Sequence, residues 1–255
     1  MQLKLEERTP QRVLVVAAHP DDIEFGVAGS VAKWIAAGAE VTYLIVTDGS
    51  AGSNDPGVDP DELAARRRAE QQAAAEVLGV KDVRFLGFRD GTLEPTLEVR
   101  KAITRVIREV RPDRVVTQDP TTIFVEGIYV NHPDHRAAGE ATVYATFPSA
   151  GTRPIFPELL DEGYEPHSVK ELYLMLTLEP THAVDITDVM DRKLEALFKH
   201  ESQLGPDIEE WVREMSREMG NLAGCEYAEV YRVITLDAEA HEAIEQAYEE
   251  MSEGD

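Results

Sequence analysis

Short apolar runs rich in β-branched residues alternate along the chain with amphipathic stretches. The apolar runs predict strands at 13–18, 41–47, 83–87 and 114–118. The amphipathic stretches predict helices at 26–37, 61–78, 97–110 and 136–147. Strands that alternate with helices in this way are typical of an α/β fold, in which a mainly parallel sheet is covered by helices on both faces.

The pattern weakens after residue 147. Residues 148–168 hold several prolines and glycines and predict an irregular excursion, a candidate lid or subunit contact. The rest of the chain predicts strands at 171–177, 183–186 and 229–234, helices at 189–203 and 208–222, and an acidic C-terminal helix. Because no repeat, linker or shift in composition marks a boundary, we expect residues 1–255 to form a single domain.

Composition excludes several classes of protein. Of the 255 residues, 43% are apolar and 29% are charged, which is ordinary for a globular protein. The longest apolar runs are far shorter than the ~18 residues that a membrane-spanning helix needs. Residues 1–8 lack the basic and apolar regions of a secretory signal, so we expect a cytoplasmic protein. The single cysteine, Cys225, cannot form an internal disulfide and is expected to fill space.

The net charge of the chain argues against two classes of binding partner. Acidic residues outnumber basic ones by enough to give a formal net charge of −24 at pH 7. A strongly negative surface repels phosphate backbones and anionic lipid head groups. We therefore expect neither nucleic acid nor a membrane surface as a partner.

Polar side chains gather where the expected strands end. His19-Pro20-Asp21-Asp22 follows the first strand, Asp48 the second, Asp90 the third, and His132 and His135 lie a short way beyond the fourth. In open parallel sheets, ligands bind beyond the carboxyl ends of the strands. These loops are therefore the candidate functional site.

The spacing of these residues indicates a metal site. His19 and Asp22 are three residues apart, as are His132 and His135, so each pair can converge on one ion at a turn. Two histidines and one carboxylate suit zinc with an open fourth position, the catalytic arrangement. Ferrous sites use a similar set, so the donors leave zinc and iron as alternatives.

The remaining side chains of the site are candidates for acid–base work. Asp21 lies between two expected ligands and is the candidate general base. His132 is then free to stabilise a developing oxyanion or to protonate a leaving amine. Asp134 is expected to orient His132 by a hydrogen bond.

Two motifs built from these residues resemble those of the PIG-L/LmbE-like family of zinc-dependent N-deacetylases. The first is Ala-His-Pro-Asp-Asp at 18–22, and the second is His-Pro-Asp-His at 132–135. The likeness continues in segments 47–49, 67–70, 86–91 and 184–187, and it covers most of residues 12–203.

The resemblance implies a fold, an activity and a set of roles. It implies a Rossmann-like, three-layer fold and hydrolysis of an N-acetyl group, typically on an N-acetylglucosamine unit. It also implies zinc ligands at His19, Asp22 and His135, a base at Asp21, and stabilisation of the tetrahedral intermediate by His132. Arg67 and Asp90 look like substrate contacts. The partner would be a small N-acetylated amino sugar or conjugate, and we expect a homo-oligomer.

Some features depart from the family pattern or leave alternatives open. Ile23 follows the first motif where many members have glutamate, and Ser50 stands where some sugar-specific members have an acidic residue. A related amidase acting on a thiol conjugate or another small amide, or a non-catalytic metal- or sugar-binding relative, would share the same motifs. His182 and His200 lack a partner at ligand spacing and are interpreted as structural histidines.

Overall fold

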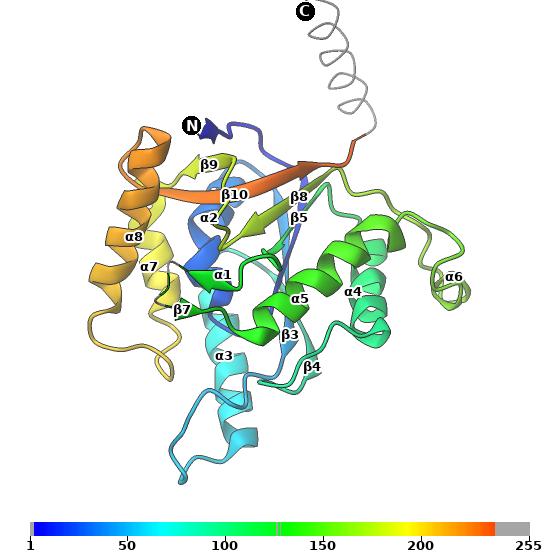
Figure 1. Ribbon diagram of the computed structural model, residues 1–255, viewed down its shortest axis with the longest axis horizontal. Coiled ribbons are helices and arrows are strands. Elements are labelled where there is room, and N and C mark those ends of the chain that lie inside the picture. The colour runs from blue at the N-terminus through cyan, green and yellow to red at the C-terminus, as the bar shows by residue number, and fades with distance from the viewer. Residues whose placement is uncertain (1–2, 126, 128, 238–255) are drawn as a thin grey trace, which may run out of the picture.

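An eight-stranded sheet forms the centre of the molecule in the computed structural model, which describes residues 3–125, 127 and 129–237 (Figure 1). Its strands are β1 (Lys4–Leu5), β2 (Arg12–Ala17), β3 (Glu40–Thr47), β4 (Asp82–Phe88), β5 (Arg114–Gln118), β8 (Glu171–Met175), β9 (His182–Asp185) and β10 (Ala228–Thr235). They lie in the order β1-β9-β10-β8-β5-β2-β3-β4. Strands β8, β5, β2, β3 and β4 are parallel, and β10 runs antiparallel between β8 and β9. The predicted mainly parallel sheet is thus confirmed.

Helices cover both faces of the sheet (Figure 1). They are α1 (Asp22–Gly26), α2 (Ala28–Ala36), α3 (Pro60–Leu78), α4 (Leu97–Val110), α5 (Pro133–Tyr144), α6 (Glu158–Asp161), α7 (Met190–Leu197) and α8 (Ile208–Ala223), with a π-helical turn at Ala145–Ser149 and a 3₁₀ turn at Thr187–Val189. Among the described helices, none is long and apolar enough to cross a membrane.

Two hydrophobic cores lie on opposite faces of the sheet, and β2 contributes to both. Val13 and Val15 point into the core formed with α1, α2, α3 and α7, whereas Leu14 and Val16 point into the core formed with α4 and α5. Side chains of a strand alternate between faces, so a strand buried on both sides must be apolar throughout. This is why 13–18 has no polar positions, and it places the loop after β2 at the centre of the molecule.

Local signals explain where the long helices begin and end. The Asp59 side chain accepts hydrogen bonds from the backbone of Asp61 and Glu62, and Pro60 opens α3 without losing a helical hydrogen bond. Gly79 ends α3 with φ +90°, a conformation that glycine adopts without strain. The observed bounds of α4, Leu97–Val110, are those predicted from its apolar spacing.

Helix boundaries next to the polar loops differ from the prediction. The helix expected at 26–37 begins at Asp22 and is interrupted at Val27, whose φ of −149° is not helical. The helix expected at 136–147 begins at Pro133, because the His132 ring caps it by accepting from the Asp134 backbone. Both motifs therefore lie at helix starts. A short hairpin of β6 (Phe124–Val125) and β7 (Tyr129–Val130) was not expected from the sequence.

The segment at 148–168 is irregular, as predicted, apart from α6. It packs against α4 rather than lying alone: the buried Arg108 guanidinium donates to the carbonyl oxygens of Ser149, Ala150, Thr152 and Ile155. These contacts anchor the segment to the scaffold. The predicted acidic C-terminal helix lies outside the described residues.

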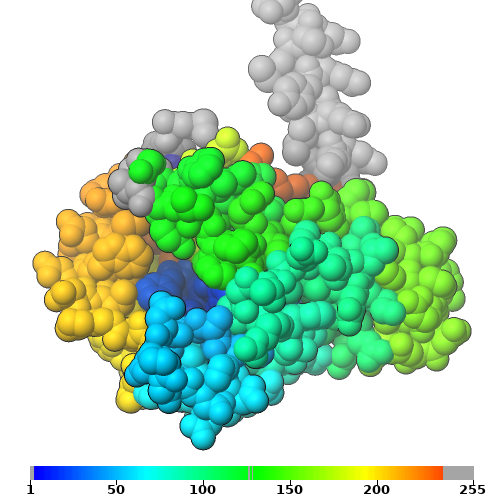
Figure 2. Space-filling view, turned by 60° about the horizontal axis from the view of Figure 1, so that its bottom comes forward, coloured from blue at the N-terminus to red at the C-terminus, as the bar shows by residue number. Residues whose placement is uncertain are grey.

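The two edges of the sheet differ in shape. Figure 2 looks toward the edge where the parallel strands end, and it shows a hollow with the N-terminal part of the chain, in dark blue, at its floor. Later segments of the chain, coloured cyan, green and orange, form the walls. The expected functional loops follow strands that end at this edge.

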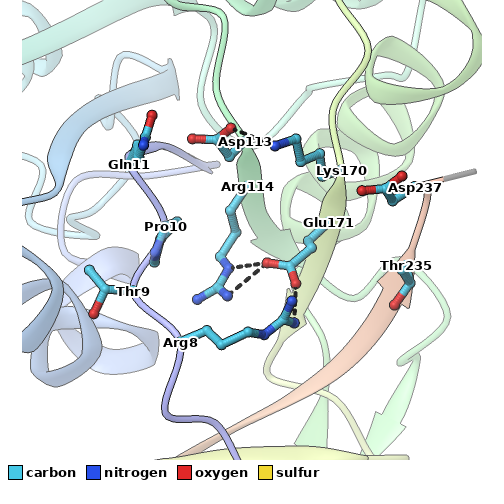
Figure 3. Close-up of a pocket in the computed structure, with 10 residues that line it drawn as sticks. All are labelled: Arg8, Thr9, Pro10, Gln11, Asp113, Arg114, Lys170, Glu171, Thr235 and Asp237. Carbon is cyan, nitrogen blue, oxygen red and sulfur yellow. Dashed lines mark hydrogen bonds and ion pairs between the residues drawn. The ribbon is translucent and has the colours of Figure 1, made fainter. Parts of the chain in front are cut away.

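The opposite edge holds a cavity of about 290 Å³, and buried charges are paired beside it (Figure 3). Arg114, 1% exposed, donates two hydrogen bonds to Glu171, of 2.7 and 3.0 Å. Its guanidinium also stacks over the Tyr173 ring, 3.9 Å from the centroid. Arg8 binds the other oxygen of Glu171 at 2.5 Å. One carboxylate thus joins the N-terminal segment to the starts of β5 and β8.

We expect Glu171→Ala to lower the free energy of unfolding by about 3 kcal/mol, because it leaves a buried guanidinium without its main partner. Glu6, 4.0 Å from Arg114, is too far to replace it. Urea unfolding measures the change. The matched control is Glu179→Ala, which removes an exposed ion pair with Arg232 and should cost less than about 0.5 kcal/mol. Equal losses in the two variants would contradict the assignment.

Candidate metal centre and active site

The loop after β2 carries the first motif in an unusual backbone conformation. Asp21 has φ +100°, which is rare for a residue other than glycine, and α1 starts at the next residue. Two side chains of α3 hold this backbone: Arg67 donates to the Pro20 carbonyl at 2.7 Å, and Gln71 accepts from the Asp21 N–H at 3.0 Å. The side chains of Asp21 and Asp22 consequently leave the chain in different directions.

His19, Asp22 and His135 come together as predicted for metal ligands. The Nε2 atom of His135 lies 3.0 Å from Asp22 Oδ1, and His19 Nδ1 lies 3.4 Å from Asp22 Oδ2. One nitrogen or oxygen from each of the three residues lies within 4.8 Å of the others. These separations suit atoms that share one ion with ligand distances of about 2.0–2.2 Å.

Neighbouring amides orient two of these ligands. Asp22 Oδ2 accepts hydrogen bonds from the His19 backbone at 2.7 Å and from Gln118 Nε2 at 2.8 Å, which leaves Oδ1 facing His135. The Nδ1 atom of His135 lies 3.0 Å from Asn131 Oδ1, an oxygen that can only accept. When Nδ1–H donates to Asn131, Nε2 is the ring nitrogen left for a metal ion. That donor geometry fits a metal ion.

His19 sits among three carboxylates. Its Nε2 atom lies 3.0 Å from Asp90 Oδ1 and 3.4 Å from Asp134 Oδ2, opposite the nitrogen that faces Asp22. Burial opposes the charged ring, but these carboxylates, Asp22 first, raise the pKa of His19 well above 6.5. Burial likewise opposes ionisation of Asp90, but His19 outweighs it and lowers the pKa of that carboxyl to about 2. Such an excess of buried negative charge favours a bound cation.

Asp21 is placed beside the expected ligands but faces Arg67, whose Nη2 lies 3.2 Å from Oδ2. Burial and the charge of Asp22 raise the pKa of Asp21 from 3.8 to about 6, and Arg67 opposes this shift. A carboxylate with a raised pKa is a better proton acceptor than an ordinary aspartate.

His132 contacts the same cluster, with its ring centroid 4.7 Å from that of His19. Its Nδ1 atom accepts from the Asp134 backbone at 3.2 Å, so its proton is on Nε2. Burial, then the charge of His19, lowers the pKa of His132, which favours the neutral ring. The hydrogen bond by which Asp134 was expected to orient His132 comes from the Asp134 backbone N–H and not from its carboxylate. That carboxylate accepts from the Gly91 and Leu93 backbones and lies near His19, and the backbone of Asp134 orients His132.

Arg67 and Asp90, the expected substrate contacts, are both at the site and both buried. Their side chains approach to 3.7 Å, and Asp90 also accepts from the Ala51 backbone at 3.0 Å. The neighbouring Arg66 points outward and pairs with Glu70, so Arg67 is the arginine of this helix that faces the site. A direct contact of either residue with substrate stays a prediction.

The sequence did not reveal two groups of side chains around the motifs. They are three amides, on Gln71, Gln118 and Asn131, and the buried pair of His200 and Glu24. The sequence positions of two of the amides could have identified them. Gln118 is the last residue of β5, and Asn131 follows the hairpin directly before the second motif. The position of Gln71 gave no signal, since a glutamine on a helix is usually solvated. His200, interpreted as a structural histidine, is fully buried and its Nε2 lies 3.0 Å from Glu24. Burial lowers the pKa of His200, but Glu24 outweighs it, so the pKa is raised overall.

Known proteins are similar to this chain in sequence and in fold. The diacetylchitobiose deacetylase of Thermococcus kodakarensis is 39% identical over 232 residues, which are 88% of this chain and 83% of that protein. A probable N-acetyl-alpha-D-glucosaminyl L-malate deacetylase 2 of Bacillus anthracis is 31% identical over 215 residues, 81% of this chain and 88% of the relative. The structure of N,N'-diacetylchitobiose deacetylase from Pyrococcus horikoshii superposes with a TM-score of 0.83 and 35% identity, covering 89% of this chain and 84% of the other.

The family match includes both motif loops. Residues 14–146, more than half of the chain, match the family described as PIG-L, GlcNAc-PI de-N-acetylase. The three expected ligands, the expected base and His132 all lie within that range. With this match and relatives that align over most of their own length, the chain belongs to the PIG-L family.

Proposed function

We propose that this protein is a zinc-dependent N-deacetylase that removes an acetyl group from an N-acetylglucosamine-type sugar. The observation that carries the proposal is the convergence of His19, Asp22 and His135 beside the half-buried Asp21. The donor set has nitrogen and oxygen atoms without a thiolate, as in catalytic zinc sites that keep an open position. Relatives named as deacetylases support the reaction type.

The mechanism assigns separate tasks to the side chains of the site. When bound, zinc supplies a Lewis acid that polarises the amide carbonyl and lowers the pKa of water to about 7. Asp21 takes a proton from the attacking water and delivers it to the amine nitrogen as the C–N bond breaks; Arg67 holds its Oδ2 atom, which leaves Oδ1 to carry that proton. His132 donates from Nε2–H to the oxyanion of the tetrahedral intermediate, since its Nδ1 is already an acceptor.

The substrate class follows from the relatives together with the charge of the chain. Diacetylchitobiose is uncharged, whereas a malate conjugate is anionic. A protein with a net charge of −24 repels anionic ligands at long range. We therefore propose a neutral N-acetylated amino sugar as the substrate. Separately, we propose that the protein is a homo-oligomer.

Acetate release from diacetylchitobiose tests the reaction and its substrate class. We expect turnover of this disaccharide to exceed that of N-acetylglucosaminyl malate, with a difference that shrinks as salt screens the charge of the protein. A preference for N-acetylglucosaminyl malate would overturn the neutral substrate but keep the deacetylase, whereas a preference for a thiol conjugate would move the protein to the related amidases. Metal binding without release of any amine would favour the non-catalytic relative.

Metal content of the purified protein tests the ligands. We expect about one zinc or iron ion per chain, lost in Asp22→Ala and in His135→Ala because each removes a donor from a three-ligand set. Elemental mass spectrometry after reconstitution measures this, with Asp188→Ala on the exposed surface as the control. Wild-type metal content in both site variants would refute their role as ligands.

Replacing the base should separate metal binding from turnover. We expect Asp21→Asn to keep its metal but lose about 10²–10⁴-fold in kcat, the usual contribution of a positioned base. Acetate release at saturating substrate gives kcat, and metal content is measured on the same sample. Wild-type turnover in this variant would remove Asp21 from the mechanism.

A further inference from the structure

The conformation of Asp21 needs support from outside its own loop. Its φ of +100° is one that side-chain-bearing residues rarely adopt, and such strain persists only where surrounding groups hold it. The N–H of Asp21 is held by one acceptor, Gln71 Oε1, at 3.0 Å. The position of the proposed base therefore depends on the direction in which the Gln71 amide points.

A glutamine amide can bind in two directions, because its oxygen accepts and its nitrogen donates. If the Gln71 amide turned over, its NH₂ group would face the N–H of Asp21, and two donors would meet. Glu24 selects the observed direction. Gln71 Nε2 lies 3.0 and 3.1 Å from the two oxygens of Glu24, and a carboxylate only accepts.

His200 in turn holds Glu24. It lies in the turn after α7, and its Nε2 atom is 3.0 Å from Glu24 Oε2. Glu24, Gln71 and His200 each have 0% exposure, so water does not compete for these bonds. The other ring nitrogen of His200, Nδ1, is buried with no hydrogen-bond partner among the described residues. An orphaned polar atom destabilises a fold, so a residue that served only to fill this space would be apolar.

We propose that Glu24 and His200 are positioning residues for the reaction, which fix the Gln71 amide and through it the backbone of Asp21. The inference rests on the proposed function, because it takes Asp21 as the general base. In the part of the chain that the structure describes, neither side chain makes a hydrogen bond or ion pair with an expected metal ligand. Glu24 and His200 would thus set the position of the Asp21 carboxylate without affecting the metal ligands.

The first test replaces the carboxylate that selects the amide direction. In Glu24→Gln the Gln71 amide faces a side chain that has both a donor NH₂ group and an acceptor oxygen. The Gln71 amide is therefore no longer held in one direction. We expect kcat for diacetylchitobiose to fall by roughly 10- to 100-fold, as for small misplacements of a reacting group. Metal content and KM should stay within about twofold. Wild-type kcat in a variant that binds metal would overturn the proposal.

Exchanging the two side chains should restore activity. In the double variant Glu24→Gln/Gln71→Glu, the group beside Asp21 is a carboxylate, which accepts in either direction, and the amide introduced at position 24 donates to its other oxygen. We expect kcat to recover to within about threefold of wild type, because every donor again meets an acceptor. This variant keeps the charge and volume of the pair, so it also tests the proposal where Glu24→Gln folds poorly. No recovery in a folded, metal-loaded double variant would contradict the proposal.

His200 is tested by a matched pair of substitutions. His200→Gln keeps a donor where Nε2 stands and should retain most of the activity, whereas His200→Phe fills the space without a donor and should lose kcat in the same way as Glu24→Gln. The control is Glu70→Gln, the same chemical change at a carboxylate that binds Ser202 in the neighbouring turn. An amide can still accept from the Ser202 backbone and donate to its hydroxyl, so we expect wild-type kcat there. Equal kcat in His200→Gln and His200→Phe would argue against the proposal.

A double-mutant cycle separates this inference from the proposed function. In an Asp21→Asn background the base is already lost, so adding Glu24→Gln should lower kcat no further. A further loss equal to that in the wild-type background would show that Glu24 acts by another route, and would overturn the inference alone. Wild-type activity of Asp21→Asn by itself would instead overturn the proposed base.

Discussion

Buried negative charge at one edge of the sheet is the constraint on which the rest of the site depends. Five carboxylates meet there with little access to water: Asp21, Asp22, Glu24, Asp90 and Asp134. Charges of the same sign in a poorly solvated region repel strongly unless each finds a compensating group. The compensating groups at this edge are the histidines and the arginine that face the carboxylates, and the backbone N–H groups that donate to them. A metal cation bound by the expected ligands would add further positive charge to this cluster.

The two edges of the sheet treat buried charge in opposite ways. At the amino ends of β5 and β8, Glu171 is shared between Arg8 and Arg114, and the ion pairs are closed on themselves. At the carboxyl ends, one nitrogen or oxygen atom from each of His19, Asp22 and His135 lies within 4.8 Å of the others, as expected for a shared ion. The first arrangement stabilises the fold. In the second, the negative charge of the carboxylates is not fully compensated until a cation binds. The expected functional residues therefore lie at one edge of the sheet, and buried ion pairs stabilise the other edge.

Much of the fold could be predicted because its signals are local. Runs of β-branched residues marked the strands, and apolar spacing fixed the bounds of the helix at 97–110. The two motifs supplied the expected ligands, because strand ends in a parallel sheet meet at one edge. Helix starts at Asp22 and Pro133 were missed, since tertiary contacts and a histidine cap decide them. The roles of Gln71 and His200 had no local signal, because they arise only when α3 and the turn after α7 pack behind the first motif.

The placement of the ligands also bears on how the chain is held together. His19 and Asp22 follow β2, whereas His135 lies far along the sequence in α5, beyond three further strands of the sheet, β3, β4 and β5. An ion bound by all three closes a long loop of chain, as a disulfide does elsewhere, in a protein whose single cysteine forms no internal bridge. Because a ligand that binds only the folded state stabilises it by mass action, the heat resistance of this protein would follow the free metal concentration around it. The site would then serve as a cross-link as well as a reaction centre.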